Sequence, residues 1–186
     1  RRRRPTGQRA TGKTAAFGLP LLNQVDTHAR VPQAIVICPT RELCVQITKD
    51  LEAFSRHMKG LKILAVYGGS SIQNQISALR QGVQVIVGTP GRLNDLIDRN
   101  VLRLSDVSVA VLDEADEMLN MGFREAIETI LATTPEEKVT WLLSATMPKE
   151  VAKIAERFML NPLRISAGGE NKTASNIEHV YYEVQA

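Results

Sequence analysis

The sequence is poor in cysteine and in aromatic residues, and it contains no long apolar run. Two cysteines, Cys38 and Cys44, are too few for a disulfide framework, and the three histidines do not combine with them in a zinc-like spacing. We therefore expect both cysteines to be reduced, packed thiols. No stretch approaches the roughly 20 apolar residues that span a bilayer, and no signal-peptide core follows the first arginines. These absences predict a cytoplasmic protein without membrane contact.

An excess of basic charge is also missing outside the N-terminus. The net charge of +3 includes Arg1, Arg2, Arg3 and Arg4, and without these four the chain has 19 basic and 20 acidic side chains. Any nucleic-acid contact must then be local. Aromatic residues make up 4% of the chain, which argues against base stacking. We expect residues 1–6 to be a basic arm that is disordered or foreign to the natural protein.

Short apolar runs alternate with longer segments of helical periodicity from about residue 12 to residue 165. Strands are expected at 34–38, 62–66, 84–87, 109–112, 139–143 and 163–165. Helices are expected at 13–27, 41–57, 71–80, 91–99, 115–132 (with a break near Gly122) and 148–158. Continuous apolar strands indicate burial on both faces. The alternation predicts an α/β fold, a doubly wound, mostly parallel sheet with helices on both faces.

This fold would occupy residues 7–166. Residues 167–186 would form a loop and the start of a linker towards a missing second domain, with a strand-like pattern at 177–184. Five aromatic side chains lie in apolar faces and are expected in the core: Phe17, Phe54, Phe123, Trp141 and Phe158.

Residues 7–14 match the pattern GxxxxGK[ST]. In such a loop, backbone N–H groups and a helix N-terminus surround phosphate oxygens, the lysine binds the β- and γ-phosphates, and the hydroxyl binds Mg²⁺. The candidate nucleotide-binding residues are Gly7, Gln8, Arg9, Ala10, Thr11, Gly12, Lys13 and Thr14. A glycine-containing helix N-terminus with an exposed lysine is the alternative, because residues 1–6 do not form the buried strand that should precede a phosphate loop.

Two adjacent carboxylates, Asp113 and Glu114, follow the apolar run 109–112. Ionised groups beside a core are costly unless they are compensated, and a magnesium ion with a nucleoside triphosphate commonly compensates them. Asp113 would hold Mg²⁺, through water, and Glu114 would orient or deprotonate the attacking water. With Lys13, these are the predicted catalytic residues; Thr14 and Asp113 are the predicted metal ligands.

Hydroxyl groups follow the strand at 139–143. Ser144 and Thr146 can bond to carboxylates without filling the site, and Asp116 is their predicted partner. A helix cap before Pro148 is the alternative. Together the three side chains are expected to report the nucleotide state to the neighbouring strand end.

Three further strand ends carry groups suited to binding phosphates without recognising bases. Each of them alone is compatible with a simple cap or turn. Together they predict a track for the backbone of a single strand, made of Pro39, Thr40, Arg41, Gly68, Gly69, Thr89, Pro90, Gly91 and Arg92.

The order of Gly-Lys-Thr, Pro-Thr-Arg-Glu-Leu, Gly-Gly, Thr-Pro-Gly-Arg, Asp-Glu-Ala-Asp and Ser-Ala-Thr resembles that in the DEAD-box RNA helicases. The resemblance covers about residues 7–184 and is strongest to the N-terminal RecA-like domain, of a bacterial or initiation-factor-like type. It implies a RecA-like P-loop NTPase domain, ATP and Mg²⁺ as cofactors, and RNA backbone and a second RecA-like domain as partners. We expect the isolated domain to be a monomer.

The resemblance implies the ATP-binding core domain of an RNA-dependent ATPase that locally unwinds or remodels RNA duplexes. Lys13 and Thr14 would bind triphosphate and Mg²⁺, Asp113 the metal and Glu114 the water. Ser144 and Thr146 would couple hydrolysis to strand separation. The RNA backbone would contact Thr40, Arg41, Gly69, Thr89 and Arg92.

The phosphate loop departs from the family pattern Ala-x-Thr-Gly-x-Gly-Lys-Thr. Arg9 and Ala10 take the Thr and Gly positions, or else two residues before Lys13 are missing. The family's adenine-recognising glutamine motif and its second domain also fall outside this sequence. We therefore expect little activity from this chain alone. Two alternatives stay open, a nucleotide-independent RNA- or protein-binding module and a P-loop motor that acts on DNA.

Overall fold

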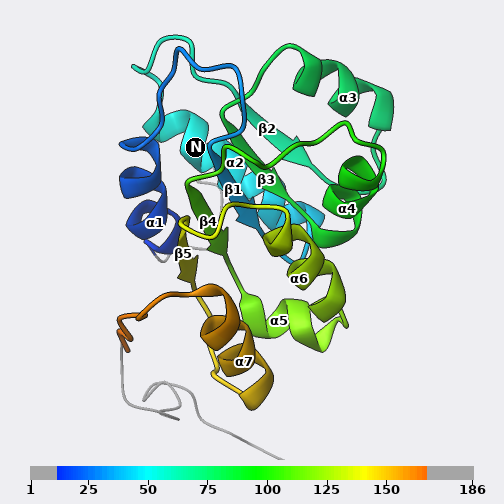
Figure 1. Ribbon diagram of the computed structural model, residues 1–186. Coiled ribbons are helices and arrows are strands. Elements are labelled where there is room, and N and C mark those ends of the chain that lie inside the picture. The colour runs from blue at the N-terminus through cyan, green and yellow to red at the C-terminus, as the bar shows by residue number, and fades with distance from the viewer. Residues whose placement is uncertain (1–11, 167–186) are drawn as a thin grey trace, which may run out of the picture.

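A computed structural model describes residues 12–166. At its centre is a five-stranded sheet in which every pairing is parallel, with the order β2-β3-β1-β4-β5 (Figure 1). The strands are β1 (Ala34–Ile37), β2 (Ile63–Val66), β3 (Val85–Gly88), β4 (Val109–Leu112) and β5 (Val139–Leu142). The three middle strands are buried along their whole length, because helices cover both of their faces. The predicted α/β fold is confirmed.

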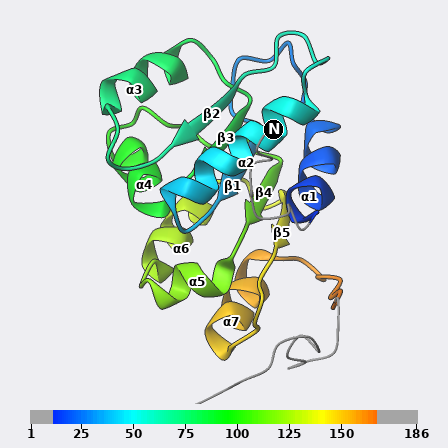
Figure 2. The same cartoon turned by 180° about the vertical axis from the view of Figure 1, so that it is seen from behind.

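Seven helices are described in residues 12–166. They are α1 (Lys13–Leu22), α2 (Arg41–Phe54), α3 (Ile72–Arg80), α4 (Pro90–Asp98), α5 (Ala115–Asn120), α6 (Arg124–Ala132) and α7 (Lys149–Phe158). Helices α1 and α2 bury apolar side chains such as Leu21 and Ile47 against one face of the sheet. The other helices cover the opposite face, where Leu93, Met118 and Ile127 belong to a second apolar cluster (Figures 1 and 2).

Two helix boundaries have clear chemical causes. Helix α1 ends at Leu22, five residues before the expected end, and it contains Pro20, which lacks the N–H group that helix continuation requires. The expected segment 115–132 is split into α5 and α6, because Gly122 adopts a φ of 83° that a side chain would disfavour. The predicted break near Gly122 is confirmed.

Two expectations about apolar residues are wrong. Residues 163–165 do not form a strand; Leu163 is 84% and Ile165 83% exposed. Three residues bury little apolar area, and Pro162 before them has no N–H to donate to a ladder. Phe54 is 39% exposed at the end of α2 and is not a core residue. Phe17 is buried as expected, and the remaining three aromatic side chains are half-buried against the two clusters: Phe123, Trp141 and Phe158.

The expectation that both cysteines are packed, unpaired thiols is confirmed. Cys38 and Cys44 are free and fully buried. A hydrogen bond with Cys44 and burial both raise the pKa of Cys38, so its thiol stays protonated. Within residues 12–166 no helix combines the length and apolar character that crossing a bilayer requires. The predicted arm at 1–6 and the segment 167–186, with its strand-like 177–184, lie outside the described residues.

Gly88, the last residue of β3, gives a direct test of the packing that positions the site. A Cβ added there would lie 2.7 Å from Cγ of Leu93, which is fully buried in α4. We predict that Gly88→Ala lowers the free energy of unfolding by about 1–3 kcal/mol through overpacking. Gly91→Ala is the matched control, because nothing lies within 4 Å of its added Cβ. Urea unfolding measures both, and equal effects would contradict this account of the packing.

Candidate nucleotide and nucleic-acid site

The predicted functional residues gather at one edge of the sheet, because parallel strands place their carboxyl ends together. Backbone hydrogen bonds continue past the strand ends and fix the loops there. The N–H of Asp113 donates to the carbonyl of Ile37 at 2.9 Å, and that of Leu143 donates to the carbonyl of Leu112 at 2.8 Å. Five strands therefore present their following residues on a common, rigid frame.

Lys13 and Thr14 open α1. Gly12 precedes them as the N-cap with a φ of 77°, a left-handed conformation that glycine adopts without strain. No acidic side chain lies in the first turn of α1, whose N–H groups are left available to an anion. The predicted nucleotide-binding residues at 7–11 lie outside the described residues. The described end of the loop thus has the geometry that a phosphate site needs.

Asp113 is buried at the end of β4, with 3% of its surface exposed. Burial raises the pKa of its carboxyl, the nearby charge of Lys13 opposes that rise, and Glu114 adds to it. One carboxylate oxygen accepts the N–H of Glu114 at 3.0 Å. The charge of Lys13 thus acts on the carboxyl at the end of β4.

A magnesium ion fits this donor set. Asp113 is a buried carboxylate whose charge Lys13 compensates at a distance, and a divalent cation next to it would compensate that charge directly. The part of the chain that the structure describes contains no group of three or more His, Cys, Asp or Glu side chains that could hold a metal. Mg²⁺ commonly binds proteins through one or two carboxylates and completes its shell with water and substrate phosphates, so Asp113 would be the residue that holds it.

Glu114 is held in a rare backbone conformation. Its φ is 53° and its ψ is 51°, and it occupies the N-cap of α5. For a residue with a Cβ, this left-handed backbone conformation costs about 1–2 kcal/mol of conformational free energy. The turn points the chain from β4 into α5 immediately after Asp113. This left-handed turn is the point at which the chain changes direction between the buried strand and the helix.

The three predicted coupling residues are in contact. The hydroxyl of Thr146 donates to Oδ2 of Asp116 at 2.8 Å, and the N–H of Thr146 donates to the same oxygen at 2.9 Å. The N–H of Asp116 donates to Oγ of Ser144 at 3.2 Å. The N-cap of α7 is Pro148, with no side-chain cap bond. The hydroxyls after β5 therefore bind Asp116 and do not cap α7, and the predicted contact between these residues is confirmed.

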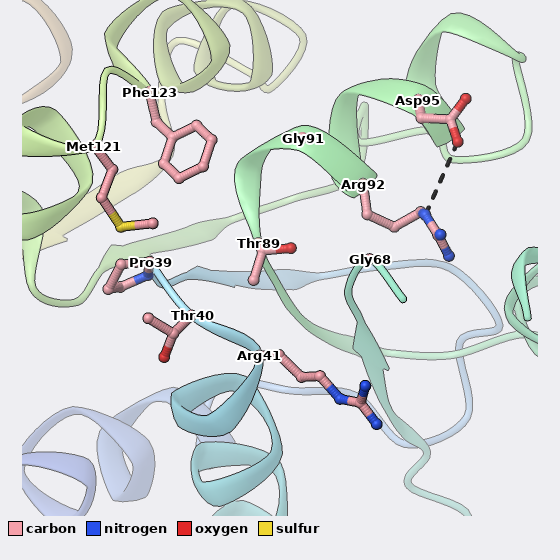
Figure 3. Close-up of a pocket in the computed structure, with 10 residues that line it drawn as sticks. All are labelled: Pro39, Thr40, Arg41, Gly68, Thr89, Gly91, Arg92, Asp95, Met121 and Phe123. Atoms are coloured by element: carbon pink, nitrogen blue, oxygen red, sulfur yellow. Dashed lines mark ion pairs between the residues drawn. The ribbon is translucent and has the colours of Figure 1, made fainter. Parts of the chain in front are cut away.

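A groove of about 540 Å³ lies at the ends of β1, β2 and β3. Seven of the nine predicted RNA-binding residues line it; Gly69 and Pro90 do not. Figure 3 shows Met121 and Phe123 at one end of the groove and Arg41, Arg92 and Asp95 at the other. The structure thus joins three separate sequence motifs into one continuous surface.

The two hydroxyls of the groove differ in their bonding. Oγ1 of Thr40 accepts the N–H of Leu43 at 3.2 Å, so Thr40 caps α2. Thr89 precedes α4 and, in the described part of the chain, makes no side-chain cap bond. Thr89 therefore has its full hydrogen-bonding capacity for a ligand, and Thr40 retains its proton as a donor.

The two arginines also differ. The Arg41 side chain is exposed, with its guanidinium 5.0 Å from the ring centroid of Tyr67. Arg92 is 14% exposed and is bonded internally, since its Nη1 donates to the carbonyl of Ser70 and to Oε1 of Gln75. Arg92 thus holds the Gly68–Ser70 loop in place as well as lining the groove.

Gln75 is a positioning residue that sequence reasoning missed. It is buried on α3, and its Nε2 donates to the carbonyl of Tyr67 at 3.1 Å and to Oγ of Ser70 at 2.7 Å. One signal was present, because Gln75 shares a helix face with Ile72 and Ile76. A polar side chain on an apolar face indicates an internal partner. Asp95, Met121 and Phe123, which also line the groove, had no comparable signal.

Comparison with known proteins gives consistent matches. A family model described as DEAD/DEAH box helicase matches residues 5–154. The chain is 54% identical over 178 residues to the DEAD-box ATP-dependent RNA helicase CshA of Bacillus cereus, covering 96% of this chain and 34% of the relative. It is 50% identical over 175 residues to the ATP-dependent RNA helicase DeaD of Klebsiella pneumoniae, covering 94% of this chain and 27% of the relative. The chain spans about a third of the length of the curated relatives it matches.

Solved structures agree with the fold. A DEAD box protein from the hyperthermophile Methanococcus jannaschii matches with a TM-score of 0.77 and 42% identity, over 83% of this chain and 42% of that one. A hypothetical ATP-dependent RNA helicase from Sulfolobus tokodaii matches with a TM-score of 0.74 and 38% identity, over 83% of this chain and 44% of that one.

The strain at Glu114 can be measured. Glu114→Gly removes the Cβ that disfavours a positive φ, whereas Glu114→Ala keeps it and removes the same carboxylate. We predict that the glycine variant is more stable than the alanine variant by about 1 kcal/mol in urea unfolding. The usual ranking, with alanine more stable than glycine, would show that this backbone conformation carries no strain.

The bond from Thr146 gives a pH-dependent prediction. Burial raises the pKa of Asp116, but the bonds from Thr146 and the nearby Ser144 outweigh it and lower the pKa overall. A carboxyl with a lowered pKa stabilises the fold above its unfolded pKa of about 4, and this contribution disappears as the pH falls through the folded pKa. Thr146→Val should therefore raise the pKa of Asp116 and, at pH 7, cost about 0.5–1 kcal/mol, since the pair is largely solvated.

NMR titration of the Asp116 carboxyl and urea unfolding at neutral and acidic pH provide the measurements. Thr133→Val is the matched control, because the Thr133 hydroxyl donates to the uncharged carbonyl of Ile130. Its cost should be independent of pH. A cost of Thr146→Val that persists below the folded pKa would contradict the assignment.

Proposed function

The chain belongs to the DEAD/DEAH box helicase family, and we propose that it forms the ATP-binding core domain of an RNA-dependent ATPase that locally unwinds or remodels RNA duplexes. The observation that carries the proposal is the meeting of Lys13, Asp113 and the Asp116–Thr146 pair at the carboxyl edge of one sheet, beside the groove. Its relatives CshA and DeaD are both named as ATP-dependent RNA helicases.

In this proposal each residue at the strand ends has a separate task. Lys13 binds the β- and γ-phosphates, Thr14 and Asp113 hold Mg²⁺, and Glu114 orients or deprotonates the attacking water. Mg²⁺, when bound, supplies positive charge that stabilises the phosphate oxygens. The location of Asp113 in a buried, low-dielectric position supports this assignment, because electrostatic interactions are stronger there than in water.

The groove would bind the backbone of a single RNA strand. Arg41 supplies an exposed positive charge, and the hydroxyls of Thr40 and Thr89 supply neutral donors. Hydroxyls, helix N-termini and arginine bind phosphates regardless of base. Residues Asp116, Ser144 and Thr146 would transmit the nucleotide state from β4 to β5, because Asp116 bonds to both hydroxyl-bearing residues.

A second RecA-like domain would complete the active site in a full-length protein. In related phosphoryl transfers an added arginine contributes on the order of 10³–10⁵ in rate. We accordingly propose that this 186-residue chain alone neither unwinds RNA nor hydrolyses ATP appreciably, and that it is a monomer. RNA-stimulated ATP turnover at a rate typical of kinases, roughly 1–100 s⁻¹, by the purified chain would contradict this.

The altered phosphate loop favours one alternative function. Either Arg9 and Ala10 stand where the family pattern has Thr and Gly, or two residues before Lys13 are missing. A nucleotide-independent RNA- or protein-binding module would keep the fold and the groove without the phosphate grip.

A calorimetric titration with Mg·ATP separates the two functions. We predict saturable binding by the chain. Lys13→Ala should lower the affinity at least tenfold, because the substitution removes a positive charge that would pair with two phosphates. Lys153→Ala is the control, since Lys153 lies on α7 and pairs with Glu150. Affinity that is indifferent to Lys13, or no binding at all, would favour the nucleotide-independent module.

A further inference from the structure

Strand β2 forms one end of the sheet. Its neighbour on one side is β3, and within residues 12–166 no strand pairs with its outer edge (Figures 1 and 2). Its first three residues, Ile63, Leu64 and Ala65, are half-buried, whereas β1, β3 and β4 are buried throughout. An accessible strand edge presents backbone groups that can pair with another extended chain.

The backbone hydrogen-bonding groups of β2 point to alternate sides. The carbonyls of Lys62 and Val66 accept N–H groups from the β3 side at 3.1 and 3.0 Å. Because the direction of these groups reverses from one residue to the next, Ile63 and Ala65 direct their N–H and C=O groups outward. The described part of the chain provides no partner on that side. Such a row of donors and acceptors is complementary to a second extended backbone.

A cavity of about 450 Å³ opens beside the start of β2. It lies between the ends of α2 and α3, and its apolar lining includes four half-buried side chains, those of Met58, Leu61, Ile63 and Leu64. Gly68, which lines the proposed RNA groove, follows the other end of β2. A segment that lies along the start of β2 can therefore insert an apolar side chain into the cavity without entering that groove.

The charged residues of the cavity favour an acidic ligand. Three charged side chains line it, of which Arg56 and Lys62 are basic and Glu52 is acidic. Within residues 12–166 neither basic side chain forms an ion pair. Nζ of Lys62 donates to the carbonyl of Gln81 at 3.2 Å, and Nε of Arg56 donates to Nε2 of His57 at 3.0 Å. Both charges are thus held at the cavity and are available to a carboxylate.

A second copy of this chain does not supply that carboxylate. Two copies related by a twofold axis would pair their β2 strands antiparallel, so each would bring the end of its own β2 to the cavity of the other. That end consists of Val66, Tyr67 and Gly68, none of which is acidic. Lys62 at the edge also disfavours contact with an equally basic edge. The edge therefore suits a different chain.

We propose that the outer edge of β2 and this cavity form a docking site for an extended, acidic segment of a partner protein. The segment pairs its backbone with Ile63 and Ala65, inserts an apolar side chain into the cavity, and places carboxylates against Arg56 and Lys62. Strand addition of this kind takes affinity from main-chain hydrogen bonds and specificity from alternate side chains. The inference goes beyond the proposed function and does not depend on it, because no nucleotide or RNA residue takes part.

NMR titration of the ¹⁵N-labelled 186-residue chain with synthetic peptides tests the proposal, since it measures weak affinities and reports the fold of each variant. The probe is a peptide of about six residues, a common strand length, in which glutamate and valine alternate. The comparison peptide has lysine in place of each glutamate. It keeps the backbone and the apolar pattern and reverses the charge.

For the unmodified chain we expect the glutamate peptide to bind roughly tenfold more tightly than the lysine peptide, because Arg56 and Lys62 attract the first and repel the second. In the complex the amides of Ile63 and Ala65 should shift and exchange more slowly with solvent. The amide of Leu64 already faces β3, so its exchange should change least. This alternation distinguishes strand pairing from binding to the cavity alone.

The double variant Arg56→Glu with Lys62→Glu should reverse the preference, so that the lysine peptide binds more tightly. Loss of fold cannot produce such a reversal. Lys49→Glu with Arg103→Glu is the matched control, because both residues are exposed and neither lines the cavity. It makes the same change in net charge and should leave the glutamate peptide preferred.

Several results would overturn the inference. Absence of binding, or equal affinity for the two peptides, would exclude charge complementarity at the cavity. Unchanged exchange at Ile63 and Ala65 in the bound state would exclude strand pairing. Protection of these amides that grows with protein concentration without peptide would assign the edge to a second copy of the chain. Tighter binding of an oligouridine than of the glutamate peptide at the same residues would assign it to nucleic acid.

Discussion

The burial of the Asp113 carboxylate at the end of β4 is the constraint on which the site depends. Burial raises its pKa, and the charge of Lys13 and the N–H of Glu114 oppose this rise. The desolvation cost of such a buried charge is commonly offset by a ligand or partner group, and carboxyls of this kind are concentrated at functional sites. The left-handed turn at Glu114 and the hydrogen bonds of Asp116 lie within three residues of this carboxylate, and the charge of Lys13 acts on it from α1.

The parallel register explains why a small sheet unites so many functions. Each strand has four residues, and neighbouring parallel strands are paired from their first residue to their last. The loops after all five strands therefore begin at the same edge of the sheet. The proposed metal and water residues follow β4, the proposed coupling hydroxyls follow β5, and the groove residues follow β1, β2 and β3. Strand β1, whose end carries the groove residues Pro39 and Thr40, pairs directly with β4, whose end carries Asp113.

Much of this arrangement could be predicted from local sequence. The apolar runs gave all five described strands, because the three middle strands are buried on both faces and the edge strands β2 and β5 are also largely apolar. The meeting of Asp116 with Thr146 followed from strand order and hydroxyl chemistry. The strand at 163–165 was wrong because apolar side chains alone do not supply a pairing partner. The exposure of Phe54 was missed because a residue at a helix end can leave the face that its periodicity assigns to it.

The network behind the groove could not be predicted. Gln75, Ser70 and Arg92 come from three elements and meet through side-chain and carbonyl contacts that no spacing rule encodes. The same holds for Asp95, whose carboxylate lies between Arg92 and Arg99. Binding of Mn²⁺·ATP, with Mn²⁺ replacing Mg²⁺, tests the central claim most directly, since the paramagnetic ion broadens NMR signals near it. We predict that the amide signals of Gly12–Thr14 and of Asp113–Ala115 broaden together at the lowest ratios. Broadening confined to one of these segments, or to residues at the opposite edge of the sheet, would contradict the account.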